Sequence, residues 1–362
     1  PLSERSLSPP SPLKPSKGMA ETRTAQIKGE LSDLKSKMSD EKINSIIEDT
    51  ERLRKRQSEP DSETDRETIP LLSLKDISRK AEQLPLVEKE KSGTKVLLCP
   101  VFTNRIAYLN LFFDTKCVPE DKIPYIGLLA EVIGKIGTEK YDYGKLSNAI
   151  NIETGGIKAR VEVYVDKDDD GKFSPKLTVK SKALAENEPE LMELLGEILG
   201  HTRFDDKKRL KEIIMETRSR LEMAMLNSGH LVASQRLLSY FSQSGKYTEE
   251  LGGLEFYKFI SDLEKNFDSI SDQIINELQY VSDAIFNRQN LLVGVTTDMK
   301  DYREFEDNFG ALAAELGDKK SKPQRYAFNT TSDNEGLITP GKVQFAAKGY
   351  NFKRLGYSYN GG

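Results

Sequence analysis

The residues of this chain best arranged to hold an ion are the carboxylates between positions 166 and 171. They reproduce the first half of a calcium-binding loop, in the order Asp166, Asp168, Asp170 and Gly171. A complete loop also needs a bidentate glutamate at its twelfth position, where this chain has Leu177. The flanking residues show strand patterns, whereas an EF-hand loop lies between helices. We therefore interpret the segment as an acidic hairpin loop, with a weak calcium site as the alternative.

Imidazole and thiol groups, which are the usual zinc ligands, are scarce. The complete set is His201, His230, Cys99 and Cys117. A zinc site built from these types would need most of them to converge, so we expect none. His201 follows a helix end near Arg203 and His230 lies in a helix-to-helix turn, where a cationic ring suits the helix dipole better than a metal does. Two cysteines make no disulfide framework and indicate a reducing compartment.

Composition excludes several classes of function. The chain has 362 residues, a net charge of −4, 37% hydrophobic and 31% charged residues, enough for about two domains with a solvated surface. It has no long basic block of the kind that binds nucleic acid, and we interpret Lys207–Arg209 as a solvated patch. It has neither a run of about 18 apolar residues that could span a membrane nor a signal peptide.

Two helices are predicted near the N-terminus. After a Ser- and Pro-rich start, apolar residues recur at helical spacing between Ile27 and Met38 and again between Ile43 and Leu53. Ser39 is placed to cap the second helix, so we expect an antiparallel helical hairpin with one narrow apolar stripe. The apolar, Pro-punctuated connector that follows, including Ile69–Leu74, is expected to lie along another domain.

An α+β domain is predicted from about residue 85, with an antiparallel-type sheet packed by many helices. Residues 95–98 and 106–114 are expected to pair around a turn at Thr103, and residues 157–165 and 177–181 to form a hairpin. Apolar stripes predict helices at 123–136 and 143–151 and a mostly helical stretch after Ala185, including helices at 254–263 and 270–286. A strand at 290–296 and a last helix follow.

Several stretches together resemble the presequence-protease branch of the pitrilysin/insulinase zinc metallopeptidases. They are Leu13–Gly18, Ile69–Ile77, Thr154–Ile157, Arg203–Glu212 and Asn351–Tyr357, in an order that covers most of the chain. The resemblance implies four related αβ domains in two halves, which are joined by a helical hairpin and close around a chamber. Only one half does chemistry, and this chain resembles the C-terminal, non-catalytic half.

The resemblance also implies a domain layout. We expect a disordered or torn terminus (1–16), a helical hinge (17–58), a connector (59–84), a third-domain-like αβ domain (85–317), a linker (318–340) and the start of an incomplete fourth domain (341–362) that opens with a strand near Lys342. Pro1 and Gly362 both look like cuts in a longer protein. The family's substrate-binding Arg and Tyr of the fourth domain would lie beyond Gly362, so neither is carried over.

In that family, a His-x-x-Glu-His motif on one helix supplies two histidine ligands to zinc and a glutamate that acts as the catalytic base, and a Gly-x-x-Lys-Tyr turn follows. Gly137–Tyr141 matches the turn, which places the motif on Leu128, Glu131 and Val132. A zinc hydrolase needs protein ligands on one helix face and an open position for water. Here both histidine positions are aliphatic, so we expect neither a metal nor a catalytic residue in this segment. Zinc is implied only for the missing catalytic half.

The function expected is therefore that of a fragment of a zinc metalloendopeptidase, forming its hinge and a non-catalytic chamber wall. Its partners would be the catalytic N-terminal half of the same protein and short unfolded peptides, without nucleic acid or membrane. A catalytically dead scaffold subunit of the same superfamily and a calcium-dependent binding module are the alternatives. A bacterial cytoplasm is the expected location, with a mitochondrial or plastid matrix as the other candidates.

Overall fold

The structure is a computed structural model, which describes residues 17–80, 83–166, 169, 171–319, 322–331, 333–338 and 343–358. The chain separates into two compact units, Pro1–Glu82 and Gln83–Gly362. The expected disordered terminus at 1–16 lies outside the described residues. None of the described helices is both long enough and apolar enough to cross a bilayer.

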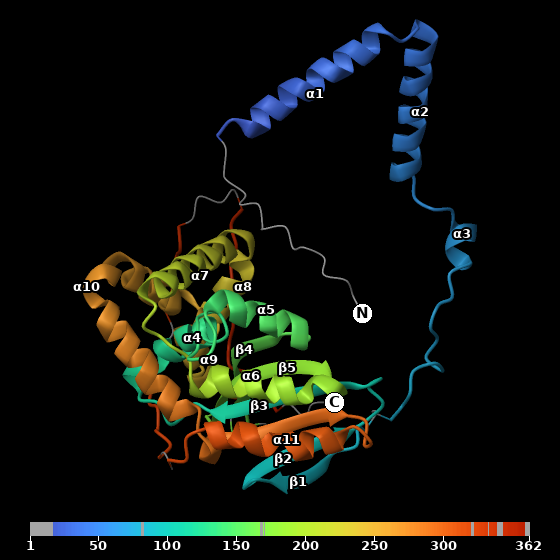
Figure 1. Cartoon of the computed structure of the whole chain (residues 1–362). Helices are drawn as coiled ribbons and strands as arrows, with labels where there is room; N and C mark the ends of the chain where they lie inside the picture. The colour runs from blue at the N-terminus through green and yellow to red at the C-terminus, as the bar shows by residue number, and fades with distance from the viewer. Residues whose placement is uncertain are drawn as a thin grey trace, which may run out of the picture. The chain divides into compact units, whose positions relative to one another are not determined.

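In the described part of unit 1, residues 17–80, the helices contain no buried residue. The unit holds α1 (Met19–Ser36), α2 (Asp40–Ser58) and the short α3 (Glu63–Glu67). Ser39 caps α2 as predicted, because its hydroxyl accepts a hydrogen bond from the Lys42 N–H at 3.3 Å. However, α1 and α2 diverge from the break between them (Figure 1), so the antiparallel packing expected of a hairpin is not formed.

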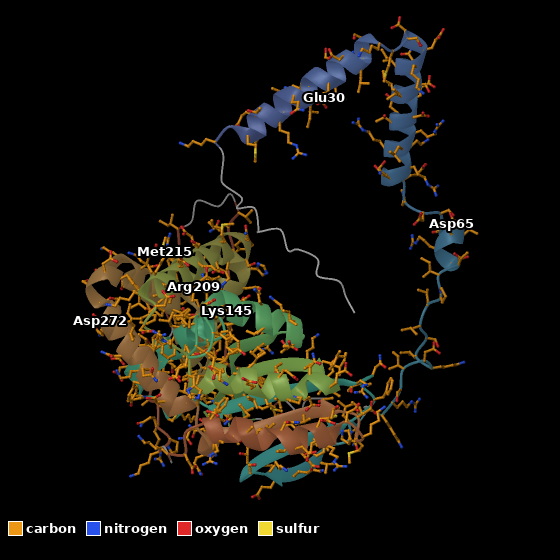
Figure 2. The ribbon with its side chains drawn as sticks, in the orientation of Figure 1. Glu30, Asp65, Lys145, Arg209, Met215 and Asp272 are labelled. Carbon is orange, nitrogen blue, oxygen red and sulfur yellow. The ribbon has the colours of Figure 1, made fainter. Side chains whose placement is uncertain are left out.

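The apolar stripes of both long helices are consequently exposed within unit 1. Leu31 is 60% exposed on α1 and Leu53 is 56% exposed on α2. Side chains such as those of Glu30 and Asp65 project from the helices of this unit without a second layer around them (Figure 2). The connector is equally bare, with Leu72 and Leu74 exposed. The apolar residues of both stripes therefore recur at helical spacing, but residues 17–80 do not bury them.

Unit 2 is built on one mixed sheet. Its described strands are β1 (Val87–Lys91), β2 (Thr94–Pro100), β3 (Ile106–Asp114), β4 (Ile157–Val165), β5 (Phe173–Leu184) and β6 (Leu291–Thr297), in the order β1-β2-β6-β3-β5-β4. All neighbours are antiparallel except β2 and β6, which are parallel. The α+β prediction is confirmed, and the predicted β4–β5 hairpin is formed.

The predicted pairing of residues 95–98 with 106–114 is wrong, because β6 lies between β2 and β3 and pairs with both. The neighbour of β2 along the chain with which it pairs is β1, a strand that was not predicted. Their turn uses Ser92 and Gly93, both with positive φ, as a tight hairpin of this kind requires. A short, buried strand rich in β-branched residues, such as β6, suits a central position in a sheet. The sequence around β6 does not indicate between which two strands it lies.

The two faces of the sheet differ in burial. One face forms the core, with Val96, Leu98, Leu109, Leu111, Phe113, Leu177, Val179, Val293 and Val295 all buried. Alternate residues on the opposite face, which we call the open face, are half-buried or exposed, apart from the buried Thr178. They include Leu97, Tyr108, Asn110, Phe112, Lys158, Arg160, Lys180 and Lys182.

Helices pack on the sheet. They are α4 (Ile123–Val132), α5 (Tyr143–Glu153), α6 (Glu188–Gly200), α7 (Lys207–Asn227), α8 (Gly229–Ser239), α9 (Gln243–Gly252), α10 (Leu254–Ile285) and α11 (Tyr302–Glu315), with 3-10 turns at Glu120–Lys122, Ala185–Asn187 and Arg288–Asn290. The helices predicted at 254–263 and 270–286 are one continuous helix, α10. Its buried stripe runs unbroken through Phe267, which bridges the polar stretch between the two predicted segments.

The segment after α11 does not leave the body. The described residues between 322 and 338 lie extended along it, with Phe328 only 8% exposed, although this region was expected to be a linker. Residues 343–347 form no strand, so the strand predicted to open at Lys342 is not seen in the part of it that the structure describes. Phe345 instead lies against His230, with their ring centroids 5.6 Å apart.

Helix α4 makes a close backbone approach in the core. A Cβ atom added at Gly127 would lie 2.7 Å from the Leu251 carbonyl oxygen and 2.8 Å from the ring of Phe256. Both neighbours are themselves held in the helical layer by α9 and α10. A glycine at this position therefore lets α4 sit against the two helices without displacing them.

Substituting Gly127→Ala should destabilise unit 2 by about 1–3 kcal/mol, because overpacking outweighs the gain in helix propensity. The matched control is Gly310→Ala in α11, where the added methyl would meet only Ser92 Oγ at 3.7 Å. That variant should be neutral or up to about 1 kcal/mol more stable. Urea denaturation followed by circular dichroism measures both, and equal stability of the two variants would contradict the close approach.

Candidate functional site

The residues at the expected zinc-motif positions lie on α4 and are part of the core. Leu128 and Val132 are both 0% exposed, and the helix packs against α7, α9, α10 and strand β4. Pro124 in the first turn starts the helix where a missing N–H costs nothing. The face that would have to present two imidazoles is filled with carbon and sealed by its neighbours.

Glu131, at the position of the catalytic base, is held by two cations. Its carboxylate lies 2.5 Å from an Nη atom of Arg220 on α7 and 3.2 Å from Nζ of Lys135. Its side chain is 25% exposed, so the group is partly solvated at the rim of the helical layer. Such an arrangement connects α4 to α7 and leaves the carboxylate committed to ion pairs.

These residues do not fit the zinc ion that the peptidase chemistry would require. Aliphatic Leu128 and Val132 offer no lone pair, and a divalent ion placed between them would lose its water shell without gaining ligands. Within the described ranges, no group of three or more His, Cys, Asp or Glu side chains is arranged to hold a metal. The two cysteines, Cys99 and Cys117, are half-buried and form no disulfide with each other.

The turn after α4 forms a small polar junction with the end of α6. The Glu139 N–H donates to the His201 carbonyl at 3.0 Å and the Arg203 N–H donates to the Gly137 carbonyl at 2.9 Å. Lys140 extends over α6, where its Nζ lies 2.9 Å from Glu193 and 3.5 Å from Glu197. A cavity of about 360 Å³ lies beside this turn and is bordered by Tyr141, Tyr143, Arg203 and Asp205 among others.

His201 connects this junction to the end of α11. Its Nε2 lies 2.7 Å from Glu315 and its Nδ1 lies 3.4 Å from Glu139. The hydrogen bond with Glu315, together with the nearby charges of Glu139 and Glu197, raises the pKa of His201 above 6.5, against a smaller opposing effect of burial. The geometry thus suits the interpretation of His201 as a cation at a helix end rather than as a metal ligand. Its partners Glu139 and Glu315 were not predicted.

The acidic loop between β4 and β5 is only partly described, because Asp168 and Asp170 lie outside the described residues. Asp166 accepts from the Asp169 N–H at 3.2 Å, while Asp169 accepts from the Gly171 N–H at 3.0 Å and pairs with Lys172 at 3.1 Å. Leu177, at the twelfth position of the would-be calcium loop, is buried in β5. A strand residue that points into the core cannot act as the bidentate ligand.

The basic cluster Lys207–Arg209 and the glycine turn at Gly155 make contacts that hold the fold together. Lys207 pairs with Asp272 at 2.6 Å, which joins the start of α7 to α10, and the Arg209 Nε donates to the Lys135 carbonyl. The Gly155 N–H donates to the Lys182 carbonyl at 2.7 Å, and the Lys182 side chain lies over the glycine. Sequence spacing identified these positions but not their long-range partners.

The pKa of His201 predicts a pH dependence of stability. Because its pKa is raised on folding, the stabilising contribution is complete below about pH 6.5 and is lost as the pH rises through the folded-state pKa. Glu315→Gln should lower the pKa of His201 and reduce this pH-dependent contribution, which is under about 1 kcal/mol for a partly exposed pair. Proton NMR titration, with His201→Gln to assign the signal, measures it; an unchanged His201 titration in Glu315→Gln would contradict the contact.

Comparisons with known proteins find relatives that match most of this chain. A family model for the region associated with peptidases of family M16, subfamily C, matches residues 13–263. "Protein HypA" of Clostridium perfringens is 41% identical over 349 residues, which are 96% of this chain and 36% of that protein. "Presequence protease 1, chloroplastic/mitochondrial" of Arabidopsis thaliana is 26% identical over 353 residues, which are 96% of this chain and 32% of that protein.

A solved structure, the peptidase M16 inactive domain from Pseudomonas fluorescens, is similar with a TM-score of 0.47 and 17% identity over 67% of this chain and 54% of its own. The chain spans about a third of the length of the two curated relatives above. The resemblance to the presequence-protease branch that the sequence predicts is confirmed, and the chain belongs to the family of regions associated with M16 peptidases of subfamily C.

Proposed function

We propose that this chain is the hinge and non-catalytic wall of a zinc metalloendopeptidase whose zinc-binding helix lies elsewhere in the same protein. The observation that carries the proposal is the state of α4, where Leu128 and Val132 are buried carbon and Glu131 is committed to Arg220. In this proposal, zinc belongs to the catalytic half alone. The segments 85–317 and 341–362 correspond to the third domain and to the beginning of the fourth.

The open face of the sheet supports the role of a wall. It carries aromatic and charged side chains side by side, including the 39% exposed Tyr108. Burial would raise the pKa of Glu162, but hydrogen bonds from Lys180, Tyr164 and Thr178 outweigh it and lower the pKa to about 2. Aromatic residues and arginine are enriched at protein interfaces, so an accessible sheet face of this composition supports contact with a peptide.

The helices of unit 1 support the role of a hinge. They expose apolar stripes on α1 and α2 that residues 17–80 leave uncovered, which is typical of helices that pack between larger bodies. The catalytic half of the same protein is the partner that we propose for them. We expect the bacterial cytoplasm as location, because the relative with 41% identity is bacterial; the relatives in organelles keep a matrix location as the alternative.

The second candidate is a catalytically dead scaffold subunit of the same superfamily, since a fully packed α4 suits it equally well. A stable complex with a non-peptidase partner, detected by light scattering, would favour the scaffold. Restoration of peptide cleavage on mixing with a catalytic half would favour the wall.

The test starts with the chain by itself, dialysed against zinc and then against buffer. We expect substoichiometric zinc, close to none per chain, by atomic absorption and no cleavage of a fluorogenic unfolded peptide. Mixing it with the separately purified catalytic half should then restore cleavage. Stoichiometric, tightly held zinc or peptide cleavage by this chain alone would overturn the proposal.

Glu131→Gln provides the matched control within that mixture. Because Glu131 pairs with Arg220 and Lys135 rather than with water on a metal, the variant should support the same kcat as the wild-type chain. Its thermal stability should fall only slightly, in keeping with a partly exposed ion pair. A hundredfold or larger loss of kcat with an intact fold would show that Glu131 is catalytic.

A further inference from the structure

The segment 322–338, of which all residues but 332 are described, lies on the body in the manner of a bound peptide. Near its start, the Gln324 N–H donates to the Lys116 carbonyl at 2.6 Å, and the Tyr326 hydroxyl donates to the Val118 carbonyl at 2.7 Å. Gln243 on α9 holds the backbone of Phe328 in both directions, accepting from its N–H at 3.1 Å and donating to its carbonyl at 2.8 Å. Paired side-chain-to-backbone hydrogen bonds of this kind hold an extended segment without a sheet.

Two aromatic side chains of this segment pack on an aromatic residue of the body. Tyr326 and Phe328 stack with ring centroids 5.6 Å apart and both contact the fully buried Tyr247, at 5.5 and 6.3 Å. Tyr247 packs in turn on Phe173 at 5.5 Å. Aromatic clusters of this geometry are among the larger contributions to a docked segment.

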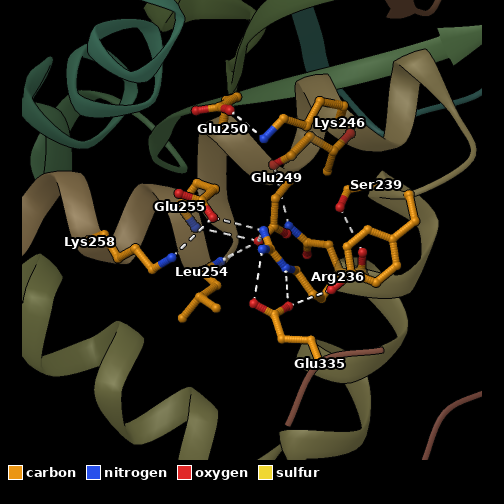
Figure 3. A network of polar contacts seen from close by, with 12 residues as sticks. Arg236, Ser239, Lys246, Glu249, Glu250, Leu254, Glu255, Lys258 and Glu335 are labelled. Atoms are coloured by element: carbon orange, nitrogen blue, oxygen red, sulfur yellow. Dashed lines mark hydrogen bonds and ion pairs between the residues drawn. The ribbon is translucent and has the colours of Figure 1, made fainter. Parts of the chain in front are cut away.

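A charged anchor holds the far end. The guanidinium of Arg236 on α8 forms two hydrogen bonds with the carboxylate of Glu335, at 2.6 and 3.1 Å, and Tyr240 donates a third (Figure 3). The hydrogen bonds from Arg236 and Tyr240 lower the pKa of Glu335. A bidentate, charge-assisted pair specifies the position of the segment more sharply than an apolar contact does.

The body keeps its own polar pairs if the segment leaves. Arg236 also contacts Glu255 at 2.9 Å and the buried Glu249 at 3.3 Å, which lie on α10 and α9 (Figure 3). The Tyr247 hydroxyl likewise shares a hydrogen bond of 2.7 Å with Thr115, which does not involve the segment. If the segment is released, Glu335 is solvated while Arg236 keeps Glu249 and Glu255 as partners. An unpaired buried cation, which makes the breaking of most buried ion pairs costly, is therefore not created.

We propose that the described residues 322–331 and 333–338 are a releasable strap, an intramolecular peptide ligand of the surface formed by residues 115–120, α9 and α8, which we call the groove. The groove selects an extended segment with two aromatics at i and i+2 and a carboxylate seven residues after the second. Residues 343–350 also contact α8, where Phe345 covers Gly229 and Gly349 lies on Leu237. When released, the strap frees that stretch and uncovers Tyr247.

Hydrogen exchange of the full chain measures strap opening through the amides of Ala327 and Phe328. Glu335→Gln should speed their exchange about tenfold and Phe328→Ala about a hundredfold, and both should also speed exchange at residues 343–350. Asn329→Ala, at an exposed strap position, is the matched control and should leave the rates within about twofold. Identical rates in all the variants would overturn the strap.

A second arm tests the groove as a binding site. A fluorescent peptide with the sequence of residues 322–338 should bind the variant Tyr326→Ala/Phe328→Ala/Glu335→Gln and not the wild type, whose groove is filled. Adding Arg236→Gln should weaken binding about tenfold, while the same peptide with glutamine for its glutamate should lose that dependence on Arg236. Failure to bind the triple variant, shown by circular dichroism to be folded, would overturn the proposal. Neither readout depends on peptidase activity, so this result is separate from that of the proposed function.

Discussion

The burial of one helix face in unit 2 is the constraint on which the rest depends. Leu128 and Val132 of α4 lie at 0% exposure, and Gly127 lets the helix approach the backbone of α9 and the Phe256 ring of α10. Because that face packs aliphatic side chains against the core, its burial stabilises the fold, and it has no ligand atoms to offer a metal ion. The helix has thus become part of the core, and Glu131 at its rim has become a link between helices rather than a base.

Charge in this unit acts as a set of links between helices that lie far apart in the sequence. Glu131 and Arg220 join α4 to α7, Lys207 and Asp272 join α7 to α10, and His201 joins the end of α6 to the end of α11. Each pair is partly solvated and worth little by itself. Each of them connects two elements that also share the apolar core. The ion pairs of Arg236 differ from these, because one of them, with Glu335, holds the extended segment after α11. No local sequence pattern predicts that this segment contacts α8.

Patterns of local origin were predicted from the sequence, and those that depend on distant partners were not. The cap at Ser39, the β4–β5 hairpin and the helical periodicity of α4 and α5 follow from neighbouring residues. The insertion of β6 between β2 and β3 joins strands far apart in the chain and leaves no local trace. At the candidate site, the sequence showed that Leu128 and Val132 are aliphatic, but it did not predict that Arg220 pairs with Glu131. Glu188 likewise has the sequence context of a solvated helix start, although burial, helped by Glu304 and Asp301, raises its pKa to about 8.

The most direct test of the account is amide hydrogen exchange of α4 with and without excess zinc. A helix that belongs to the core opens only with the whole unit, so the amides of residues 127–132 should exchange as slowly as those of β3 and β6, at rates that zinc leaves unchanged. Fast exchange of α4, or protection of its amides that appears only when zinc is added, would contradict the claim that this helix is packing rather than a metal site.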